Sequence, residues 1–260
     1  MNEQHLKEAA EQLYAAEKSL STIEHLTEKY PGITIQEAYQ IQLLVVEKKL
    51  EQGARIIGKK IGLTGKAMQE FMGVNEPDYG HLFDSLVGEE DVPVKMEQLI
   101  QPKIEAELAF VLKDKLKGPG VTVAEVLKAT EGVMASFEIV DSRYKNWKIK
   151  IQDTIADNAS TGLFILGSEI IPVSKVNLKY VGMVFERNGR VIDTAAGAAI
   201  LGHPALAVAW LANKLAEYDI ALNPGEIILS GALTRAYEIN KGDIFTATFG
   251  GIGQVKAIFE

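Results

Sequence analysis

Three glutamates lie in apolar segments of the sequence, where carboxylates are unusual. Glu105 and Glu107 alternate with apolar residues in segment 104–111, which has the character of a β-strand. Alternate side chains of a strand point to the same face, so these two carboxylates share a face about 7 Å apart along the chain. Glu138 stands in a second apolar, strand-like segment, 133–143.

Carboxylates gathered in this way could hold a divalent cation. Repulsion between buried carboxylates raises their pKa values unless a cation compensates, and a site of oxygen atoms suits Mg²⁺ or Mn²⁺. The alternatives are a solvated strand face and a set of buried salt bridges. The first is weakened because the face of Glu105 and Glu107 continues with Ala109 and Val111. The sequence does not place Glu138 beside the other two acids, so a metal site and buried salt bridges both stay open.

Two lysines interrupt another apolar segment, 58–64. Lys59 and Lys60 are neighbours there. Because neighbouring side chains of a strand point in opposite directions, one of the two should face inward. An inward lysine could bind a carboxylate or carry a proton. It could equally pair with an acid of the core or extend its charged end to solvent.

Residues 74–82 contain Pro77 and predict a loop that carries Asp78 and His81. Loops of this kind often cover binding sites, because function tends to concentrate on loops that a rigid scaffold positions. Turns also favour Asp after Pro, so a purely structural role for Asp78 is an equal alternative.

Residues 154–162 concentrate small and hydrogen-bonding groups ahead of a strand, which suits close approach of the backbone to an anionic ligand. Asp157 and Asn158 could equally be helix-cap or turn residues. The glycine-rich segments 195–199 and 250–253 lack the spacing of nucleotide-binding loops and predict tight packing or turns. His203, just before a proline at a helix start, is interpreted as structural.

The elements that must position these residues fall into two parts. Apolar residues three or four positions apart predict helices between about residues 3 and 50, with a break at 30–32. Another helix is expected at about 204–218, and Asn-Gly at 188–189 predicts a hairpin. Short apolar segments between Gly, Pro and Asn-Gly predict strands. These segments are 55–61, 106–112, 132–140, 162–166, 181–186, 226–230, 243–249 and 254–259.

This order of elements predicts an α+β fold, in which an N-terminal helical layer packs on a mixed β core, rather than an alternating βαβ array. We expect residues 1–75 to form the helical layer and the first strand. Residues 76–260 should form a β-rich catalytic core. The two parts are expected to behave as one cooperative unit.

The composition limits the classes of partner. A chain of 260 residues with 47% hydrophobic content can bury a sizeable core. A net charge of −8 gives no basic surface for nucleic acid or for an anionic membrane. The absence of cysteine excludes disulfides, thiolate metal sites and cysteine nucleophiles. No signal-peptide pattern and no apolar run of membrane-spanning length is present, so we expect a cytoplasmic location.

Five strings of residues resemble those of a known family. Across essentially the whole chain, and in order, they resemble the 2-hydroxypenta-2,4-dienoate hydratases, also called 2-oxopent-4-enoate or vinylpyruvate hydratases. With the 4-oxalocrotonate decarboxylases, these enzymes belong to the fumarylacetoacetate hydrolase superfamily. The resemblance implies a mixed β-roll core of the fumarylacetoacetate hydrolase type with an N-terminal helical layer. The strings are IGKKIGLT at 57–64, QPKIEAELAF at 101–110, EIVDSR at 138–143, WKIKIQDTIADNAS at 147–160 and GGIG at 250–253.

The resemblance also implies a metal site and an activity. The superfamily holds a divalent metal, here Mg²⁺ or Mn²⁺, through a Glu-X-Glu pair and a later acid, which match Glu105, Glu107 and Glu138. The implied reaction adds water to 2-hydroxypenta-2,4-dienoate to give 4-hydroxy-2-oxopentanoate, in the meta-cleavage catabolism of aromatic compounds. The partner is therefore a small 2-oxo- or 2-hydroxy-dienoic acid.

Four further residues are expected to act on this substrate. Lys60 is the candidate for contacting substrate or metal-bound oxygens. Asp78 is the candidate acid or base, carried on a loop that covers the site. Ser160 and Asn158 are expected to hold the substrate carboxylate.

Two other functions stay open. The 4-oxalocrotonate (2-oxo-3-hexenedioate) decarboxylases share the three acids and the Asp-Ser-Arg and Asp-Asn-Ala-Ser motifs, and loss of CO₂ could generate the same kind of enolate. A non-catalytic partner of a pathway enzyme is the third hypothesis, which the intact acids and Lys60 disfavour. The resemblance further implies a homo-oligomer and allows a complex with a pathway decarboxylase or aldolase.

Overall fold

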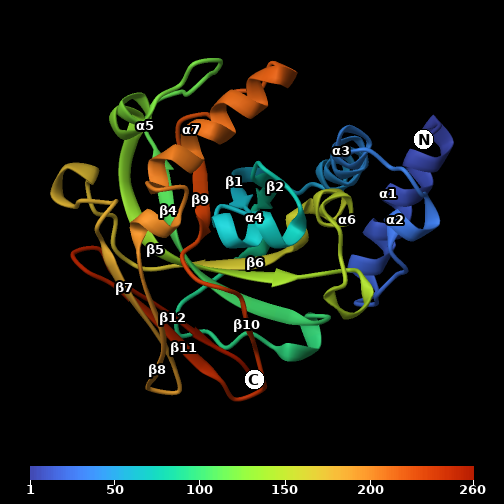
Figure 1. The fold of residues 1–260 in the computed structure, drawn as a ribbon. Helices are drawn as coiled ribbons and strands as arrows, with labels where there is room; N and C mark the ends of the chain where they lie inside the picture. The colour runs from blue at the N-terminus through green and yellow to red at the C-terminus, as the bar shows by residue number, and fades with distance from the viewer.

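Two β-sheets and a layer of helices form the structure, a computed structural model that describes residues 1–70 and 72–260 (Figure 1). The larger sheet has the strand order β2-β1-β9-β4-β5-β6-β3, and β10 pairs with β4. The smaller sheet has the order β12-β11-β7-β8. The pairs β1–β9 and β3–β6 are parallel and the others are antiparallel. The predicted α+β class with a mixed β core is confirmed.

The elements have the following bounds. The larger sheet contains β1 (Ile56–Gly62), β2 (Asp78–Phe83), β3 (Val87–Gly88), β4 (Pro102–Leu112), β5 (Thr130–Asp141), β6 (Thr161–Leu166), β9 (Ile227–Ala232) and β10 (Tyr237–Glu238). The smaller sheet contains β7 (Gly182–Arg187), β8 (Arg190–Ala196), β11 (Ile244–Phe249) and β12 (Gly253–Ile258). The α-helices are α1 (Glu3–Lys18), α2 (Leu26–Lys29), α3 (Ile35–Glu51), α4 (Lys66–Met72), α5 (Val123–Ala129), α6 (Ile151–Ala156) and α7 (Pro204–Leu215).

The N-terminal helices lie beside the larger sheet, where α3 packs against α1 and α6 (Figure 1). α3 begins with a capping box, in which the Thr34 hydroxyl accepts from the Glu37 N–H and the Glu37 carboxylate accepts from the Thr34 N–H. The helices predicted between residues 3 and 50 are therefore present. The stretch between them is less helical than predicted, because α1 ends at Lys18 and only the short α2 follows before α3.

The β4–β5 pair forms the centre of the molecule and has two different faces. The strands pair in antiparallel register with Ala106 opposite Phe137 and Glu105 opposite Glu138. Ala106, Leu108 and Phe137 belong to the main hydrophobic core. The Phe137 ring centroid lies 5.5 Å from that of Phe185 in β7. The smaller sheet therefore covers the apolar face of the pair, and the carboxylates point to the other face.

The loop predicted for residues 74–82 is wrong over most of its length. Residues 78–83 form β2, a strand with every residue buried, and β2 pairs in antiparallel register with β1. Pro77 comes just before the first residue of the strand, where its missing N–H removes no ladder hydrogen bond. Asp78 is therefore fixed on a buried strand and is not on a mobile lid.

Two local predictions are confirmed at other places. Asn188 and Gly189 have φ values of 54° and 73° and connect β7 to β8, as a two-residue hairpin turn requires. The His203 Nδ1 accepts from the Ala205 N–H at 3.1 Å and caps α7, so His203 is structural. In the part of the chain that the structure describes, no helix combines the length and the apolar character needed to cross a bilayer.

Candidate metal centre and active site

The antiparallel pairing of β4 with β5 brings three glutamates together. Glu138 stands directly opposite Glu105, and Glu107 follows two residues later on the same face of β4. One carboxylate oxygen from each of the three lies within 4.8 Å of the others. Glu107 and Glu138 are buried and Glu105 is partly buried. The register of the two strands thus creates one acidic cluster from segments that are separate in the sequence.

The electrostatics of this cluster favour a positive charge at its centre. Burial, and then repulsion by Glu138, raises the pKa of Glu105 to about 7. The same two causes raise the pKa of Glu107 well above its ordinary value. Burial also raises the pKa of Glu138. Neighbouring carboxylates that burial and mutual repulsion keep from ionising gain most from a compensating cation.

The unpaired atoms of the cluster fit a divalent metal. Glu138 Oε1 and Oε2 are buried, and neither has a hydrogen-bond partner among the described residues. Lys60 Nζ lies 3.2 Å from Glu138 Oε2 as an ion pair. The Gly231 N–H donates to Glu107 Oε2 at 2.9 Å and orients that carboxylate. A donor set of carboxylate oxygens suits Mg²⁺ or Mn²⁺ better than softer metals.

Lys60 and Asp78 reach the same region from β1 and β2. Both side chains are buried, and Asp78 pairs in register with Gly62. A Cβ atom at Gly62 would lie 2.2 Å from Asp78 Oδ1 and 3.5 Å from Lys60 Nζ, so this glycine leaves the space that both groups occupy. Burial raises the pKa of Asp78, although Lys60 opposes the effect. Burial lowers the pKa of Lys60, but Glu138 and Asp78 raise it overall. Lys60 is thus a fixed positive charge beside a carboxyl group that tends to hold its proton.

One of the two lysines was predicted to face inward, and in the structure both are buried. Lys59 is as buried as Lys60, because both faces of β1 are covered. Its Nζ lies 2.9 Å from Glu226 Oε2. Lys59 therefore has the alternative role, a buried salt bridge on the face opposite to the acidic cluster.

Past the acids, the same face of the sheet becomes apolar. A small cluster of buried side chains continues from the glutamates and is separate from the main core. The acids are therefore the charged end of an otherwise hydrophobic surface. Its members are Leu82, Ala109, Met134, Phe164 and Leu229.

Asn158, Ala159 and Ser160 form a left-handed turn between α6 and β6. Their φ values are 53°, 51° and 56°. The left-handed conformation costs about 1–2 kcal/mol for each residue that is not glycine, so three in succession need support from their surroundings. A Cβ atom at Gly80 would lie 2.4 Å from the Asn158 carbonyl oxygen, which places the turn directly on β2.

The two predicted substrate-binding residues lie in this turn, but their side chains differ in how many hydrogen bonds they already make within the protein. The Asn158 Oδ1 accepts from the His81 N–H at 2.7 Å, and the Asn158 Nδ2 donates to the His81 carbonyl at 2.9 Å. The Asn158 amide is therefore engaged by β2. Among the described residues, the buried Ser160 hydroxyl has one hydrogen-bond partner, the Thr154 hydroxyl at 3.4 Å.

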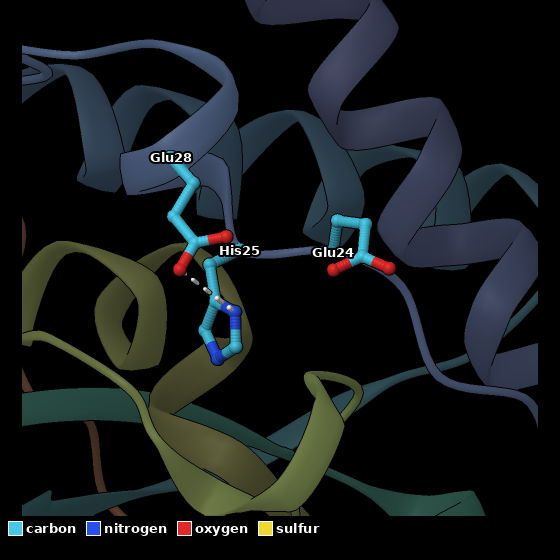
Figure 2. Close-up of side chains that lie close together, drawn as sticks. All are labelled: Glu24, His25 and Glu28. Carbon is cyan, nitrogen blue, oxygen red and sulfur yellow. Dashed lines mark ion pairs between the residues drawn. The ribbon is translucent and has the colours of Figure 1, made fainter.

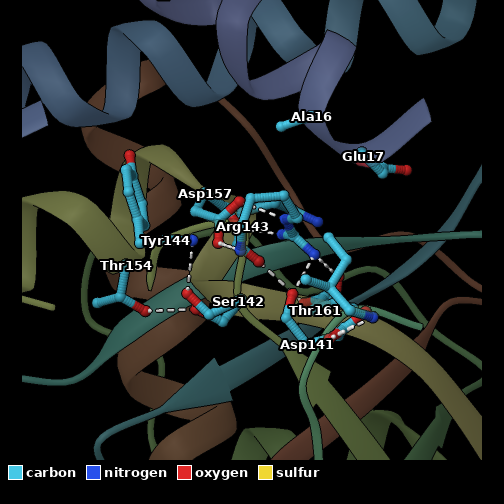
Figure 3. Close-up of polar contacts among 12 residues, drawn as sticks. Ala16, Glu17, Asp141, Ser142, Arg143, Tyr144, Thr154, Asp157 and Thr161 are labelled. Carbon is cyan, nitrogen blue, oxygen red and sulfur yellow. Dashed lines mark hydrogen bonds and ion pairs between the residues drawn. The ribbon is translucent and has the colours of Figure 1, made fainter. Parts of the chain in front are cut away.

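Arg143 had no predicted role, yet it is the centre of a buried polar network (Figure 3). Its Nε donates to Asp157 Oδ1, and its Nη2 donates to the Asp157 carbonyl at 2.5 Å. Its Nη1 donates to the carbonyls of Asp141 at 2.6 Å and Thr161 at 2.9 Å. The available signal in the sequence was a guanidinium directly after an apolar strand, where a charge is rarely buried without partners.

A second group of ligand-type residues lies near the N-terminus (Figure 2). Ligand atoms of Glu24, His25 and Glu28 also lie within 4.8 Å of one another. However, both glutamates are exposed, and Lys145 already pairs with Glu24. The His25 ring is stacked on Tyr144 with centroids 5.6 Å apart. This exposed and partly neutralised group is a weaker candidate than the buried cluster.

Comparison with known proteins agrees with this geometry. Residues 64–259 match the family described as fumarylacetoacetate (FAA) hydrolase, C-terminal. The chain is 50% identical over 218 residues to a 2-hydroxypent-2,4-dienoate hydratase of Pseudomonas putida, covering 83% of this chain and 98% of that protein. It is 41% identical over 260 residues to a 2-keto-4-pentenoate hydratase of Paraburkholderia xenovorans, covering 100% of this chain and 97% of that protein.

A solved structure resembles the whole chain. The 4-oxalocrotonate decarboxylase from Pseudomonas putida G7, complexed with magnesium and adipate, has a TM-score of 0.97 and 38% sequence identity. The alignment covers 100% of this chain and 99% of that one. Sequence, fold and relatives together show that this chain belongs to the fumarylacetoacetate hydrolase family.

Proposed function

We propose that the protein is a metal-dependent hydro-lyase that converts 2-hydroxypenta-2,4-dienoate and water to 4-hydroxy-2-oxopentanoate, in the meta-cleavage catabolism of aromatic compounds. The observation that carries the proposal is the buried cluster of Glu105, Glu107 and Glu138 with Lys60 beside it. Relatives named as hydratases at 50% and 41% identity support the choice of reaction.

Glu105, Glu107 and Glu138 would hold Mg²⁺ or Mn²⁺. Two observations support this assignment: Glu138 Oε1 is buried with no partner among the described residues, and the pKa values of all three acids are raised. When bound, the cation supplies Lewis-acid stabilisation of the negative charge that develops on the 2-oxygen of the substrate.

The surrounding residues would bind and orient the substrate. Lys60 provides a fixed ammonium group for its oxygens, since the acids keep this side chain positively charged. Ser160 and the backbone of its turn would hold the carboxylate. Asn158 would contribute by fixing the turn on β2, because its amide is engaged by His81.

Asp78 would carry the proton that the reaction moves. One proton leaves the 2-hydroxyl group and one reaches C5, which gives the conjugated 2-oxo-3-enoate. Water then adds its oxygen to C4 and a proton to C3. Asp78 Oδ1 is buried, has no hydrogen-bond partner among the described residues and lies near Lys60. It could hold a proton for C5, and Lys60 would stabilise the carboxylate that remains.

A second candidate is decarboxylation of the six-carbon diacid 4-oxalocrotonate. The TM-score of 0.97 to a 4-oxalocrotonate decarboxylase favours it. The same acids would serve, because loss of CO₂ from this substrate also places negative charge on the 2-oxygen. The two reactions differ in whether a second carboxylate must be accommodated and whether CO₂ is released.

The test is to incubate the purified protein with Mg²⁺ or Mn²⁺ and each dienoic acid, measuring CO₂ and the hydroxy-oxo acid separately. We expect 4-hydroxy-2-oxopentanoate from the five-carbon substrate without CO₂. Release of CO₂ from 4-oxalocrotonate, with no hydration of the smaller acid, would select the decarboxylase. Inertness towards both substrates would favour the non-catalytic partner.

We further propose a homo-oligomer located in the cytoplasm. The edge strand β8 supports an interface, because it pairs with β7 on one side only and leaves Val191 59% exposed. Size-exclusion chromatography with light scattering measures the assembly. Co-purification with a pathway decarboxylase or aldolase tests for a complex.

Residues 1–75 and 76–260 are proposed to unfold as one cooperative unit. Buried side chains of α1 and α3 belong to the same hydrophobic core as those of β4 and β5, which supports a single transition. Two calorimetric transitions would contradict this proposal.

A further inference from the structure

We infer that Arg143 is a positioning residue for substrate binding, which holds the left-handed turn at Asn158–Ser160 in place beside Lys60. The inference rests on the proposed function, because it concerns the turn to which we assign the substrate carboxylate. It gives a role to Arg143, whose guanidinium donates four hydrogen bonds in the polar network of Figure 3.

Arg143 donates hydrogen bonds to both ends of the turn. Its guanidinium binds the carboxylate and the carbonyl of Asp157, the residue before the turn. It also binds the carbonyl of Thr161, the residue after the turn. The planar fork of arginine presents several donors in fixed directions, so one side chain can set the distance between the two ends.

We call these contacts of Arg143 with Asp157 and Thr161 the clamp, and the arginine that forms it is itself held in place. The Arg143 guanidinium also binds the Asp141 carbonyl at the end of β5. The Asp141 carboxylate accepts from the N–H groups of Ile100 and Gln101, which lead into β4. The clamp is therefore tied to the two strands that carry the acids, and it relates the position of the turn to theirs.

The turn needs such a restraint because its conformation is unfavourable. Three successive residues that are not glycine have φ between 51° and 56°. The pair of hydrogen bonds between Asn158 and the His81 backbone is the second restraint, and the Thr161 hydroxyl donates to the Asn158 carbonyl at 2.9 Å. Without the Arg143 guanidinium, the ends at 157 and 161 would keep the Ser160 N–H bond to the Asp157 carbonyl and the pairing of Thr161 with Val140, but no side chain would join them directly, so the turn would relax more easily.

The turn is coupled to the site through β2. It rests on Gly80, and Gly80 is the register partner of Lys60. Lys60 Nζ is 3.2 Å from Glu138. None of the hydrogen bonds of Arg143 goes to the three metal-ligating acids. Its effect on the substrate should therefore pass through the turn and leave metal binding unchanged.

Arg143→Lys tests this role, because lysine keeps the charge opposite Asp157 but cannot bind the flanking carbonyls together. We expect a fall of about 20-fold or more in kcat/KM for the dienoic acid, mainly through KM, because the turn contacts the bound substrate. Affinity for Mn²⁺, measured by calorimetry, should stay within about twofold. Amide hydrogen exchange in residues 157–161 should become at least about tenfold faster, with β4 and β5 unchanged.

Ala159→Gly provides a second-site test, since glycine adopts the left-handed conformation without the steric penalty. In the Ala159→Gly background, Arg143→Lys should reduce kcat/KM only about fivefold, compared with about 20-fold in the wild-type background. Asp91→Gly is the matched control, because Asp91 is also left-handed, with φ of 62°, but is exposed and pairs with Lys256 in β12 of the smaller sheet. The full effect of Arg143→Lys should persist in that background.

Several results would overturn the inference. A folded Arg143→Lys protein with unchanged KM and unchanged exchange at 157–161 would show a merely structural arginine. An equal loss of Mn²⁺ affinity would show that Arg143 acts through the acids, and equal rescue by Asp91→Gly would show a general stability effect. If Arg143→Lys does not fold, Asp157→Asn is the second variant, because it weakens the contact between Arg143 and the turn. Unchanged amide exchange at residues 157–161 in Asp157→Asn would also contradict the inference. The exchange measurement needs no turnover, so it tests the clamp even if neither dienoic acid is a substrate.

Discussion

The two faces of the β4–β5 pair serve different purposes. One face carries apolar side chains such as Leu108 and Phe137, which pack against the smaller sheet. The other face carries Glu105, Glu107 and Glu138. Burial on the first face stabilises the fold, whereas burial on the second raises the pKa of each acid and opposes its ionisation. This pair of strands therefore gains stability on one side and carries an electrostatic cost on the other, which is the side where we propose that the cation binds.

The largest effect is expected from the apolar face. Phe137→Ala should lower the free energy of unfolding by about 3–5 kcal/mol, because it removes a fully buried ring at the contact between the sheets. Urea denaturation measures this loss. Val92→Ala is the control, since its side chain is 53% exposed, and it should change stability by no more than about 0.5 kcal/mol. Equal effects of the two variants would refute the packing role given to this face.

The acidic face should show the reverse pattern, with lost activity and a retained fold. Glu107→Gln should reduce metal-dependent turnover more than about 100-fold, because removal of a direct ligand should cost more than loss of its supporting contacts. Initial rates and circular dichroism measure the two properties. Glu24→Gln alters the exposed N-terminal group and should keep normal rates. Full activity of Glu107→Gln would disprove the site assignment.

Metal addition should stabilise the protein through the acidic face alone. Mn²⁺ at 100 times its dissociation constant should add about 2.7 kcal/mol to the free energy of unfolding. This corresponds to a rise of about 5–10 °C in Tm for a chain of this size. Thermal scans with Mn²⁺ and with excess EDTA measure the shift. Glu24→Gln should retain the shift and Glu107→Gln should lose most of it; the opposite result would move the metal to the N-terminal group.

The smallest effect concerns His81, on the face of β2 opposite to Asp78. Burial, and then Lys59, lowers the pKa of His81 to about 3. The unfolded chain takes up this proton near pH 6.5 and the folded protein does not, so the free energy of unfolding falls as the pH falls below 6.5. This group should account for about 1 kcal/mol between pH 6.5 and 5.5. Denaturation of wild type and His81→Gln at both pH values isolates the contribution, and parallel pH profiles would contradict it.

Much of the fold could be predicted because its signals are local. The spacing of apolar residues in the helices, the Asn-Gly hairpin and the alternation of residues 104–111 each depend on neighbours within a few positions. β2 was missed because Pro77 resembles a loop signal, and its harmless position before the strand depends on pairing with β1. The burial of Lys59 together with Lys60 was not predicted, because the sequence cannot show that both faces of β1 are covered.

The sequence by itself determined that Glu105 and Glu107 share a face, because the side-chain period of a strand is two and needs no partner. It also determined, through its motifs, the family to which the chain belongs. Only the tertiary structure decided that Glu138 stands opposite Glu105, because strand register is set by pairing between two separate segments, here β4 and β5. The same holds for Lys60 and Asp78 meeting over Gly62 and for Arg143 spanning the turn, since each contact depends on how separate elements pack.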